Sequence, residues 1–177
     1  DFRGVDGLYR QKYAYPPETI LSAEFFRRKP EEFYRYYREK MLVTDAEPNA
    51  AHRKLAQWER EGRLAAIVTQ NIGSQRVYEL HGSIYRNRCV RCGKFYGVED
   101  IQASGGVPRC ACGGVVKPEV VLYGESLDDR VLSGAVHAIA NADLLIVGGT
   151  SLSVYPAAGL IDYYQGDRLA LINRTQT

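Results

Sequence analysis

The chain has 177 residues, of which 45% are hydrophobic and 25% are charged. These ordinary globular values exclude a disordered or collagen-like chain and predict one domain, or one with a small appended module. The formal net charge of +2 is too small to indicate nucleic-acid or membrane binding. No apolar run approaches the roughly 20 residues that span a bilayer, and no signal peptide is recognisable, so we expect no membrane partner.

The first 62 residues are predicted to be a loop followed by helices. Residues 1–17 mix glycine with aromatic side chains and end at a Pro-Pro pair, which indicates a loop. Apolar residues recur every three or four positions over 18–41, and Pro30 divides this stretch into two predicted helices. A third helix is predicted over Ala50–Glu61, with Gly62 suited to its C-terminal end.

Strand-like and helical patterns alternate in the rest of the chain. Helices are predicted over 127–141 and 156–164. Short apolar runs typical of buried parallel strands occupy 64–68, 120–123, 144–147 and 169–172. Alternation of strand and helix predicts an α/β fold built on a parallel sheet. Residues 85–115 interrupt the alternation with cysteines and glycine-rich loops, and we interpret them as an insert.

The four cysteines are spaced as metal ligands. Cys89 and Cys92 form one close pair, and after 17 residues Cys110 and Cys112 form the other. This spacing is close to that of a zinc ribbon, although the second pair has one intervening residue. Four protein thiolates leave no open position on the ion, so the zinc would be structural. Disulfides or four free thiols are the alternatives. Reduced thiols favour a reducing, cytoplasmic location.

Polar or small residues follow each predicted strand. Ligands of an open parallel sheet bind beyond the carboxyl ends of its strands. Gln70 and Asn71 follow one strand, residues 148–151 a second and Asn173 a third, while Gly124 and Glu125 follow the run at 120–123. Together they suit a crevice for phosphate and ribose groups, although an isolated Gly-Gly-Thr-Ser turn is a weak signal.

His81 is the histidine with a possible chemical role. It lies in a Leu-His-Gly-Ser stretch, where its imidazole could act as a general base. A lone histidine is more often structural, and we interpret His52 and His137, both on predicted helices, in that way.

A series of short motifs runs along the chain in a fixed order. Together they resemble the sirtuins, the NAD-dependent protein deacylases. The matching segments are Asp1–Gly4 with Gly7–Tyr9, Thr69–Ile72, Leu80–Ser83, the four cysteines, Lys117–Glu125, Gly149–Leu152 with Val154 and Pro156–Ala158, and Ile172–Asn173.

The resemblance implies a Rossmann-like parallel sheet with helices on both faces and a second, smaller lobe. The Rossmann-like NAD-binding domain would comprise residues 1–14, 51–84 and 116–177. A helical module over 15–50 and a zinc-ribbon module over 85–115 would form the small lobe.

The resemblance also implies roles for individual residues. His81 and Asn71 would be catalytic, and the four cysteines would bind one structural zinc. An acyl-lysine peptide would pair as an added strand with Val121, Leu122, Tyr123, Gly124, Glu125 and Val154. NAD would contact Phe2, Arg3, Gln70, Asn71, Gly149, Thr150, Ser151 and Asn173.

The implied reaction consumes NAD as a cosubstrate. The acyl oxygen of the modified lysine would attack the anomeric carbon of NAD, and nicotinamide would leave. His81 would then act as general base on a ribose hydroxyl, which attacks the resulting alkylamidate. The products would be free lysine, nicotinamide and O-acyl-ADP-ribose.

The acyl group is expected to be acetyl or another neutral chain. Sirtuins that prefer acidic acyl groups resemble one another in a Tyr-x-x-Arg pair. Here Tyr34 matches the tyrosine, but Tyr37 stands where the arginine would fall. A shift of one position would make Arg38 the substitute.

Two other functions remain open at this stage. One is protein ADP-ribosyl transfer by a member of the same family. The other is a non-catalytic zinc-ribbon module that binds nucleic acid through Arg86, Arg88, Arg91 and Lys94, although such a charge run is more often a solvated face. Direct nucleic-acid binding is not expected.

Three segments of the sirtuin pattern are not found in the sequence. They are a first strand with a Gly-Ala-Gly-x-Ser phosphate loop before Asp1, an Asp-containing loop after Ile72, and a C-terminal segment after Thr175. We therefore expect these residues to be part of a longer chain.

Overall fold

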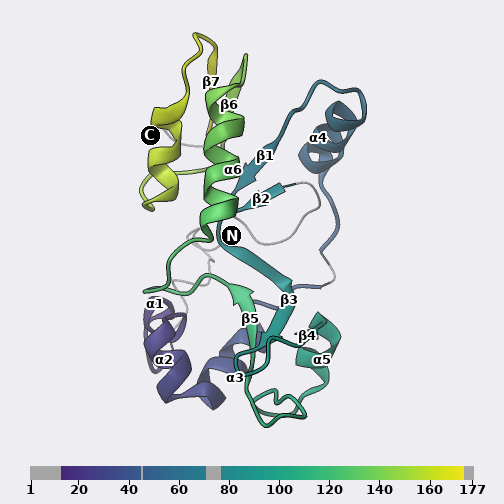
Figure 1. The fold of residues 1–177 in the computed structure, drawn as a ribbon, viewed down its shortest axis with the longest axis vertical. Helices are drawn as coiled ribbons and strands as arrows, with labels where there is room; N and C mark the ends of the chain where they lie inside the picture. Colours follow the sequence, from purple (N-terminus) through teal and green to yellow (C-terminus); the bar gives the residue numbers. More distant parts are fainter. Residues whose placement is uncertain (1–12, 45, 71–76, 174–177) are drawn as a thin grey trace. The chain divides into compact units, whose positions relative to one another are not determined.

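The computed structural model describes residues 13–44, 46–70 and 77–173 (Figure 1). It divides into two compact units, one of Asp1–Ala46 with His81–Ser126 and the other of Glu47–Leu80 with Leu127–Thr177. The three-module division expected from the sequence remains a prediction, because packing boundaries alone do not say which residues bind a ligand.

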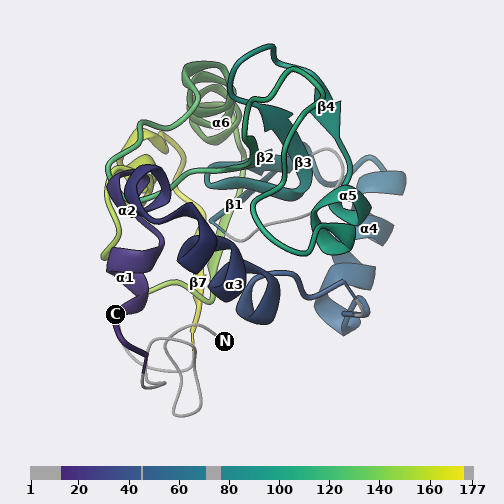
Figure 2. The same ribbon diagram turned by 90° about the horizontal axis from the view of Figure 1, so that it is seen from below.

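The first unit joins a group of helices to a small antiparallel sheet. Its elements are α1 (Pro17–Ile20), α2 (Ala23–Arg28), α3 (Pro30–Lys40), β3 (Gly82–Cys89), β4 (Phe95–Tyr96), α5 (Val98–Ala103) and β5 (Val116–Val120). The strands lie in the order β4-β3-β5. Figure 2 shows α1, α2 and α3 one after another, and the three helices pack together.

Local sequence explains the helix boundaries. The Ser22 hydroxyl caps α2 by accepting a bond from the Phe25 N–H at 3.1 Å. Pro30 starts α3, with acidic residues in the first turn and Arg38 and Lys40 in the last, as the helix dipole favours. The predicted break of 18–41 at Pro30 is confirmed, but the part before it is two short helices, α1 and α2, and not the single helix expected.

An aromatic cluster forms the core of this helical group. Phe33, Tyr34 and Tyr37 are each 0% exposed. The Phe33 ring stacks on that of Tyr37 with centroids 5.6 Å apart, and it meets Phe26 edge-on at 5.0 Å. Such pairs contribute about 0.5–1.5 kcal/mol beyond the area that they bury.

The parallel strand expected over 120–123 is a wrong prediction. The strand ends at Val120, and β5 pairs antiparallel with β3. Val116, Pro118 and Val120 are buried in alternation, which is the pattern of a half-buried strand and not of a continuous buried run. Of the following residues, Tyr123 forms an isolated parallel bridge with Ser22.

The second unit is α/β with parallel strand pairs, as expected. Its elements are α4 (Ala50–Arg60), β1 (Ile67–Thr69), β2 (Val77–Glu79), α6 (Asp129–Ala140), β6 (Leu145–Gly148), the 3₁₀ helix η2 (Ala157–Tyr163) and β7 (Leu169–Ile172). β1 pairs parallel with β2, and β6 pairs parallel with β7. The sequence did not predict β2, β3, β4 or α5, and the segment expected as a helix over 156–164 is the tighter η2.

The core of this unit lies around α6. Ala135 and Ile139 pack with Leu80 of the β2 end and with Ala157 and Leu160 of η2. A Cβ at Gly134 would lie 2.4 Å from the Tyr78 ring, so only glycine lets α6 approach β2 this closely.

β6 and β7 are less buried than the sequence predicts. Ile146 is 43% exposed, Leu169 53% and Ile172 64%, whereas Leu145 packs against the core cluster. Within the part of the chain that the structure describes, β6 and β7 pair only with each other, so the outer edge of each strand has no neighbouring strand to cover it. No helix among the described residues has the length and apolarity to cross a membrane.

Replacing Phe33 by Ala should destabilise the first unit by about 3–5 kcal/mol, because a fully buried ring leaves a cavity. Chemical unfolding monitored by circular dichroism measures the change. Phe95, which is 50% exposed, is the matched control, and Phe95→Ala should cost about 0.5 kcal/mol. Equal costs for the two variants would contradict the assignment of Phe33 to the core.

Candidate functional site

The four cysteines come together at one end of the β3–β5 sheet. Their sulfur atoms all lie within 4.8 Å of one another. The Sγ atoms of Cys89 and Cys112 are 3.4 Å apart, and those of Cys92 and Cys110 are 3.6 Å apart. Four thiolates around one zinc ion have sulfurs about 3.8 Å apart, as Zn–S bonds of about 2.3 Å require. The donor set therefore fits a tetrahedral zinc with no open position.

Tight turns present each cysteine pair. The Gly93 N–H donates to the Cys89 carbonyl at 2.9 Å, and the Gly113 N–H donates to the Cys110 carbonyl at 2.8 Å. Both glycines have positive φ, at 73° and 83°, which explains why glycine follows each pair. The Val90 N–H donates to the Val115 carbonyl at 2.9 Å and joins the two turns.

Gly114 makes room for the four clustered cysteines. A Cβ added at this position would lie 2.6 Å from the Cys89 Sγ and 2.7 Å from the Arg91 Cβ. The Arg91 guanidinium also donates to the Cys112 carbonyl at 2.8 Å, so this side chain spans both turns.

The Tyr96 hydroxyl supports one of the thiolates. Its hydrogen bond is the largest factor that lowers the pKa of Cys110, to about 6. A donor of this kind stabilises the deprotonated sulfur that binds metal. Nothing in the residue pattern singles out Tyr96, because aromatic residues in such a segment are usually packing residues.

The helical and cysteine-rich segments are joined within the first unit. The Tyr34 hydroxyl donates to the Val116 carbonyl. The Arg38 guanidinium donates to the Ile101 carbonyl at 3.0 Å, the Ser104 hydroxyl at 2.6 Å and the Gly106 carbonyl. The side chain of Arg38 therefore links α3 to the end of α5. Tyr37, the other residue considered for acyl preference, is buried.

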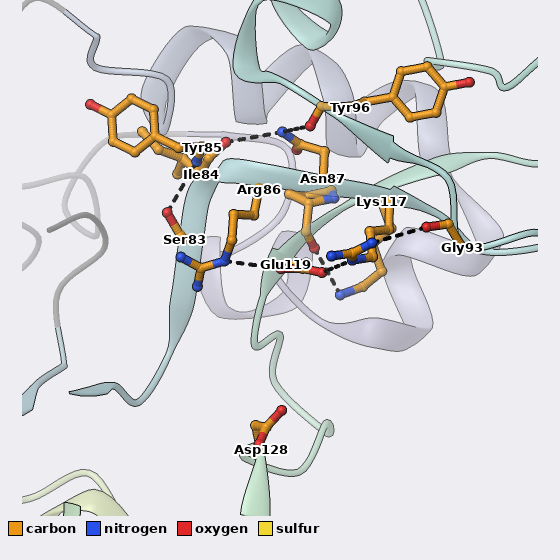
Figure 3. Close-up of polar contacts among 12 residues, drawn as sticks. Ser83, Ile84, Tyr85, Arg86, Asn87, Gly93, Tyr96, Lys117, Glu119 and Asp128 are labelled. Atoms are coloured by element: carbon orange, nitrogen blue, oxygen red, sulfur yellow. Dashed lines mark hydrogen bonds and ion pairs between the residues drawn. The ribbon is translucent and has the colours of Figure 1, made fainter. Parts of the chain in front are cut away.

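The outer face of the β3–β5 pair carries an ion-pair network. Figure 3 shows the Arg86 side chain directed toward Glu119, with Nε 3.1 Å from the carboxylate. Arg88 Nε lies 2.5 Å from the other oxygen of Glu119. Two of the four basic residues of the nucleic-acid alternative are thus paired with one acid.

His81 lies in the turn between β2 and β3. Its carbonyl accepts a bond from the Val121 N–H at 3.0 Å, so the histidine is placed beside the segment that follows β5. The next residue, Gly82, has φ +77°, and a Cβ there would lie 1.8 Å from the Glu119 carbonyl oxygen. The Leu-His-Gly-Ser motif therefore requires glycine for the close approach of β3 and β5.

The second unit brings three of the polar strand ends together. The Thr150 hydroxyl after β6 donates to the Gln70 Oε1 after β1 at 3.1 Å. The Asn173 amide after β7 donates to the Thr150 carbonyl at 2.9 Å. Gly149, with φ +64°, lets the chain turn between these contacts. Gln70, Thr150 and Asn173, which follow three of the predicted strands, therefore lie close together, and their role in a phosphate and ribose crevice stays a prediction.

The structure describes fewer contacts for other predicted site residues. The Ser151 hydroxyl lies 2.6 Å from that of Ser153, and the Val154 carbonyl accepts from the Ala158 N–H at 2.9 Å. Phe2, Arg3 and Asn71 lie outside the described residues.

The chain matches known proteins over its whole length. The Sir2 family model matches residues 1–156. A protein of Clostridium acetobutylicum named NAD-dependent protein deacetylase is 55% identical over all of this chain and 77% of its own length. A protein of the same name from Staphylococcus aureus strain Mu50 is 39% identical over all of this chain and 76% of its own.

Solved structures agree with these sequence matches. A Sir2 structure with a deacetylated p53 peptide and 3'-O-acetyl ADP ribose superimposes with a TM-score of 0.86 at 39% identity, over all of this chain and 76% of that one. A Sir2–p53 peptide–NAD+ structure gives 0.84 at 39% identity, over all of this chain and 75% of that one. The chain belongs to the Sir2 family, and its fold is the Rossmann-like α/β fold with an added zinc-binding lobe.

Elemental analysis should find one zinc per chain, because the four sulfurs form a closed tetrahedral site. Removal of the metal by a strong chelator should lower the melting temperature, since zinc binding free energy contributes to folding. Restoring zinc should reverse the change. A metal content near zero in protein prepared without chelators would contradict the site.

Gly114→Ala should weaken zinc binding by roughly ten- to a hundredfold, because the new methyl group collides with the Cys89 sulfur. Competition with a chromogenic zinc chelator measures the affinity. Gly105→Ala is the matched control: a Cβ there meets nothing within 4 Å, and affinity should be unchanged. Equal affinities for the two variants would mean that Gly114 has no such role.

Proposed function

We propose that this protein is an NAD-dependent protein-lysine deacetylase that releases nicotinamide and O-acetyl-ADP-ribose. The observation that carries the proposal is the match of 55% identity, over the whole chain, to a protein named NAD-dependent protein deacetylase. Within the Sir2 family, structures with an acetylated peptide and with an acetyl-ADP-ribose product support the same reaction.

The dinucleotide would be bound by the strand ends of the second unit. Gln70 and Asn71 would contact the ribose next to the reacting carbon, and Asn173 would contact the adenine ribose. Gly149, Thr150 and Ser151 would hold the phosphates and the adenosine side, where backbone N–H groups suit anions. Phe2 and Arg3 would cover the nicotinamide ribose and phosphates. The contacts of Thr150 with Gln70 and Asn173 support this assignment.

The acetyl-lysine peptide would add as a strand to the Val121–Glu125 segment, with Val154 as a second contact. Both backbone groups of Tyr123 are already bonded, the N–H to Leu21 and the carbonyl to Ala23. Among the described residues, the N–H and carbonyl of Gly124 have no such bond. They are therefore free to pair with a peptide main chain, a mode of recognition tolerant of sequence.

The chemistry is the transfer of an acyl group from lysine to ADP-ribose. His81 would be the general base that removes a proton from a ribose hydroxyl, because imidazole is the side chain suited to that task near neutral pH. Its bonded position beside Val121 supports this role, since Val121 begins the proposed peptide segment. Zinc, held by Cys89, Cys92, Cys110 and Cys112, would keep the small lobe folded and take no part in the reaction.

We also propose a cytoplasmic location. The four thiols lie as a metal-binding set and not as disulfides. Thiolate ligands persist where the surroundings are reducing.

Incubation with NAD and an acetyl-lysine peptide should give nicotinamide and O-acetyl-ADP-ribose, detected by chromatography and mass spectrometry. His81→Ala should lower kcat by roughly 10²–10⁴-fold, the usual contribution of a positioned base. His137→Ala, a histidine near the end of α6, is the control and should keep wild-type activity. Turnover of His81→Ala at the wild-type rate would reject His81 as the base. A protein product heavier by an ADP-ribose group would favour the transferase alternative.

Acetyl peptides should be preferred over succinyl peptides by about tenfold or more in kcat/KM, because no cation stands at the position that matches the arginine of deacylases for acidic groups. Tyr37 occupies the position of the arginine found in deacylases for acidic groups, and Arg38 is bonded to α5 and the loop after it. Steady-state kinetics on one peptide with two acyl groups measures the ratio. A higher kcat/KM for the succinyl peptide would contradict this prediction.

A further inference from the structure

Lys117 on β5 has all three ammonium donors engaged. Its Nζ donates to the Pro118 carbonyl at 3.2 Å, the Val120 carbonyl at 3.1 Å and the Glu125 Oε2 at 3.0 Å. A lysine has three donors and no acceptor, so its hydrogen-bonding capacity is full. This one side chain therefore ties the end of β5 to the last residue of the following segment.

Glu125 receives this bond while closing the turn that contains Gly124. Its Oε2 also accepts from the Leu122 N–H at 2.9 Å, and its own N–H donates to the Leu122 carbonyl at 2.9 Å. Gly124 lies inside this turn with φ +87°. The conformation of Gly124 is thus set by a carboxylate that Lys117 holds.

The pair lies in a partly enclosed environment. The side chain of Lys117 is 20% exposed and that of Glu125 is 29% exposed, and Leu122 between them in the chain is 2% exposed. Water screens such a pair less than it screens a fully exposed one, so the charge-assisted bonds constrain the segment more strongly.

The carboxylate of Glu119, which lies on β5 itself, is not part of this arrangement. Figure 3 shows Glu119 near Lys117, but Glu119 is paired with Arg86 and Arg88. The two acids therefore pair with different cations. Glu119 forms ion pairs with the two arginines of β3, and Glu125 forms one with Lys117. Glu119 thus offers a control with the same charge, six residues before Glu125 in the chain and outside the 121–125 segment.

We propose that Lys117 is a positioning residue for the peptide substrate. It acts through Glu125 and through the carbonyls of Pro118 and Val120, and it holds residues 121–125 so that the Gly124 main chain is presented for strand pairing. This inference rests on the proposed function. In it, Lys117 and Glu125 maintain the conformation of the 121–125 segment and do not contact the acetyl group.

The test compares Lys117→Met with wild-type protein in the full-length enzyme. Methionine keeps the length of the side chain but removes the charge and all three donors. KM for the acetyl-lysine peptide should rise about tenfold, the effect of losing a charge-assisted hydrogen bond. KM for NAD and kcat should stay within about twofold, because the peptide contact is made equally before and during the reaction.

Further variants separate the parts of the arrangement. Glu125→Gln keeps an oxygen for the Leu122 N–H and should raise the peptide KM less than Glu125→Ala, which loses both bonds. Lys117→Arg keeps the charge and several donors and should restore most of the binding. The control, Glu119→Gln, should leave the peptide KM at the wild-type value, with melting temperatures recorded for every variant.

A merely structural role would give a different result. Acetyl-lysine peptides methylated at single backbone nitrogens should bind wild-type protein more weakly wherever that nitrogen pairs with the segment. At that position, methylation should weaken peptide binding much less in the Lys117→Met variant than in wild-type protein. Equal penalties in both proteins, or a rise in the KM for NAD as large as that for the peptide, would overturn the proposal.

The test is separable from that of the proposed function. If wild-type protein deacetylates the peptide and Lys117→Met has the same peptide KM, the positioning role is wrong and the function stands. If wild-type protein releases no nicotinamide and binds no acetylated peptide by fluorescence anisotropy, the proposed function itself fails.

Discussion

The pairing of β3 with β5 connects the chemical features of the first unit. At one end of the pair, β3 ends at Cys89, opposite Val116, the first residue of β5. The four clustered cysteines lie at this end. At the other end, Gly82 and Val120 lie opposite each other, so His81 and Val121 are neighbours. Only glycine at 82 permits this contact, because any Cβ would meet the Glu119 carbonyl. The predicted zinc site and the proposed general base therefore lie at opposite ends of one strand pair.

The helical group depends on the same sheet. Tyr34 and Arg38 of α3 use hydrogen bonds to backbone carbonyls at Val116 and Ile101, so the aromatic core, the strand and the cysteine-rich segment form one body. The predicted preference for a neutral acyl group is consistent with this packing. Burial of Tyr37 and the bonds of Arg38 leave neither side chain to attract an acidic acyl group.

In the second unit, the ends of β1, β6 and β7 meet through side-chain bonds of Thr150 and Asn173. Polar groups at strand ends are a common way to bind a dinucleotide, since the carboxyl edge of a parallel sheet gathers them. In this unit, Thr150 is bonded to both Gln70 and Asn173, and these bonds fix the orientation of the Gln70 and Asn173 side chains.

Much of this was determined by the sequence alone. The spacing of the cysteines predicts the metal site, because ligand geometry depends on a few local residues. Polar residues such as Gln70, Thr150 and Asn173 follow predicted parallel strands, and parallel topology brings such residues to one edge of a sheet. The tertiary structure decided what depends on distant partners. An apolar run at 120–123 cannot reveal that β5 pairs antiparallel with β3 and ends at Val120. Nor can sequence show that Lys117 bonds Glu125 while Glu119 bonds two arginines, since three-dimensional proximity decides which charges pair.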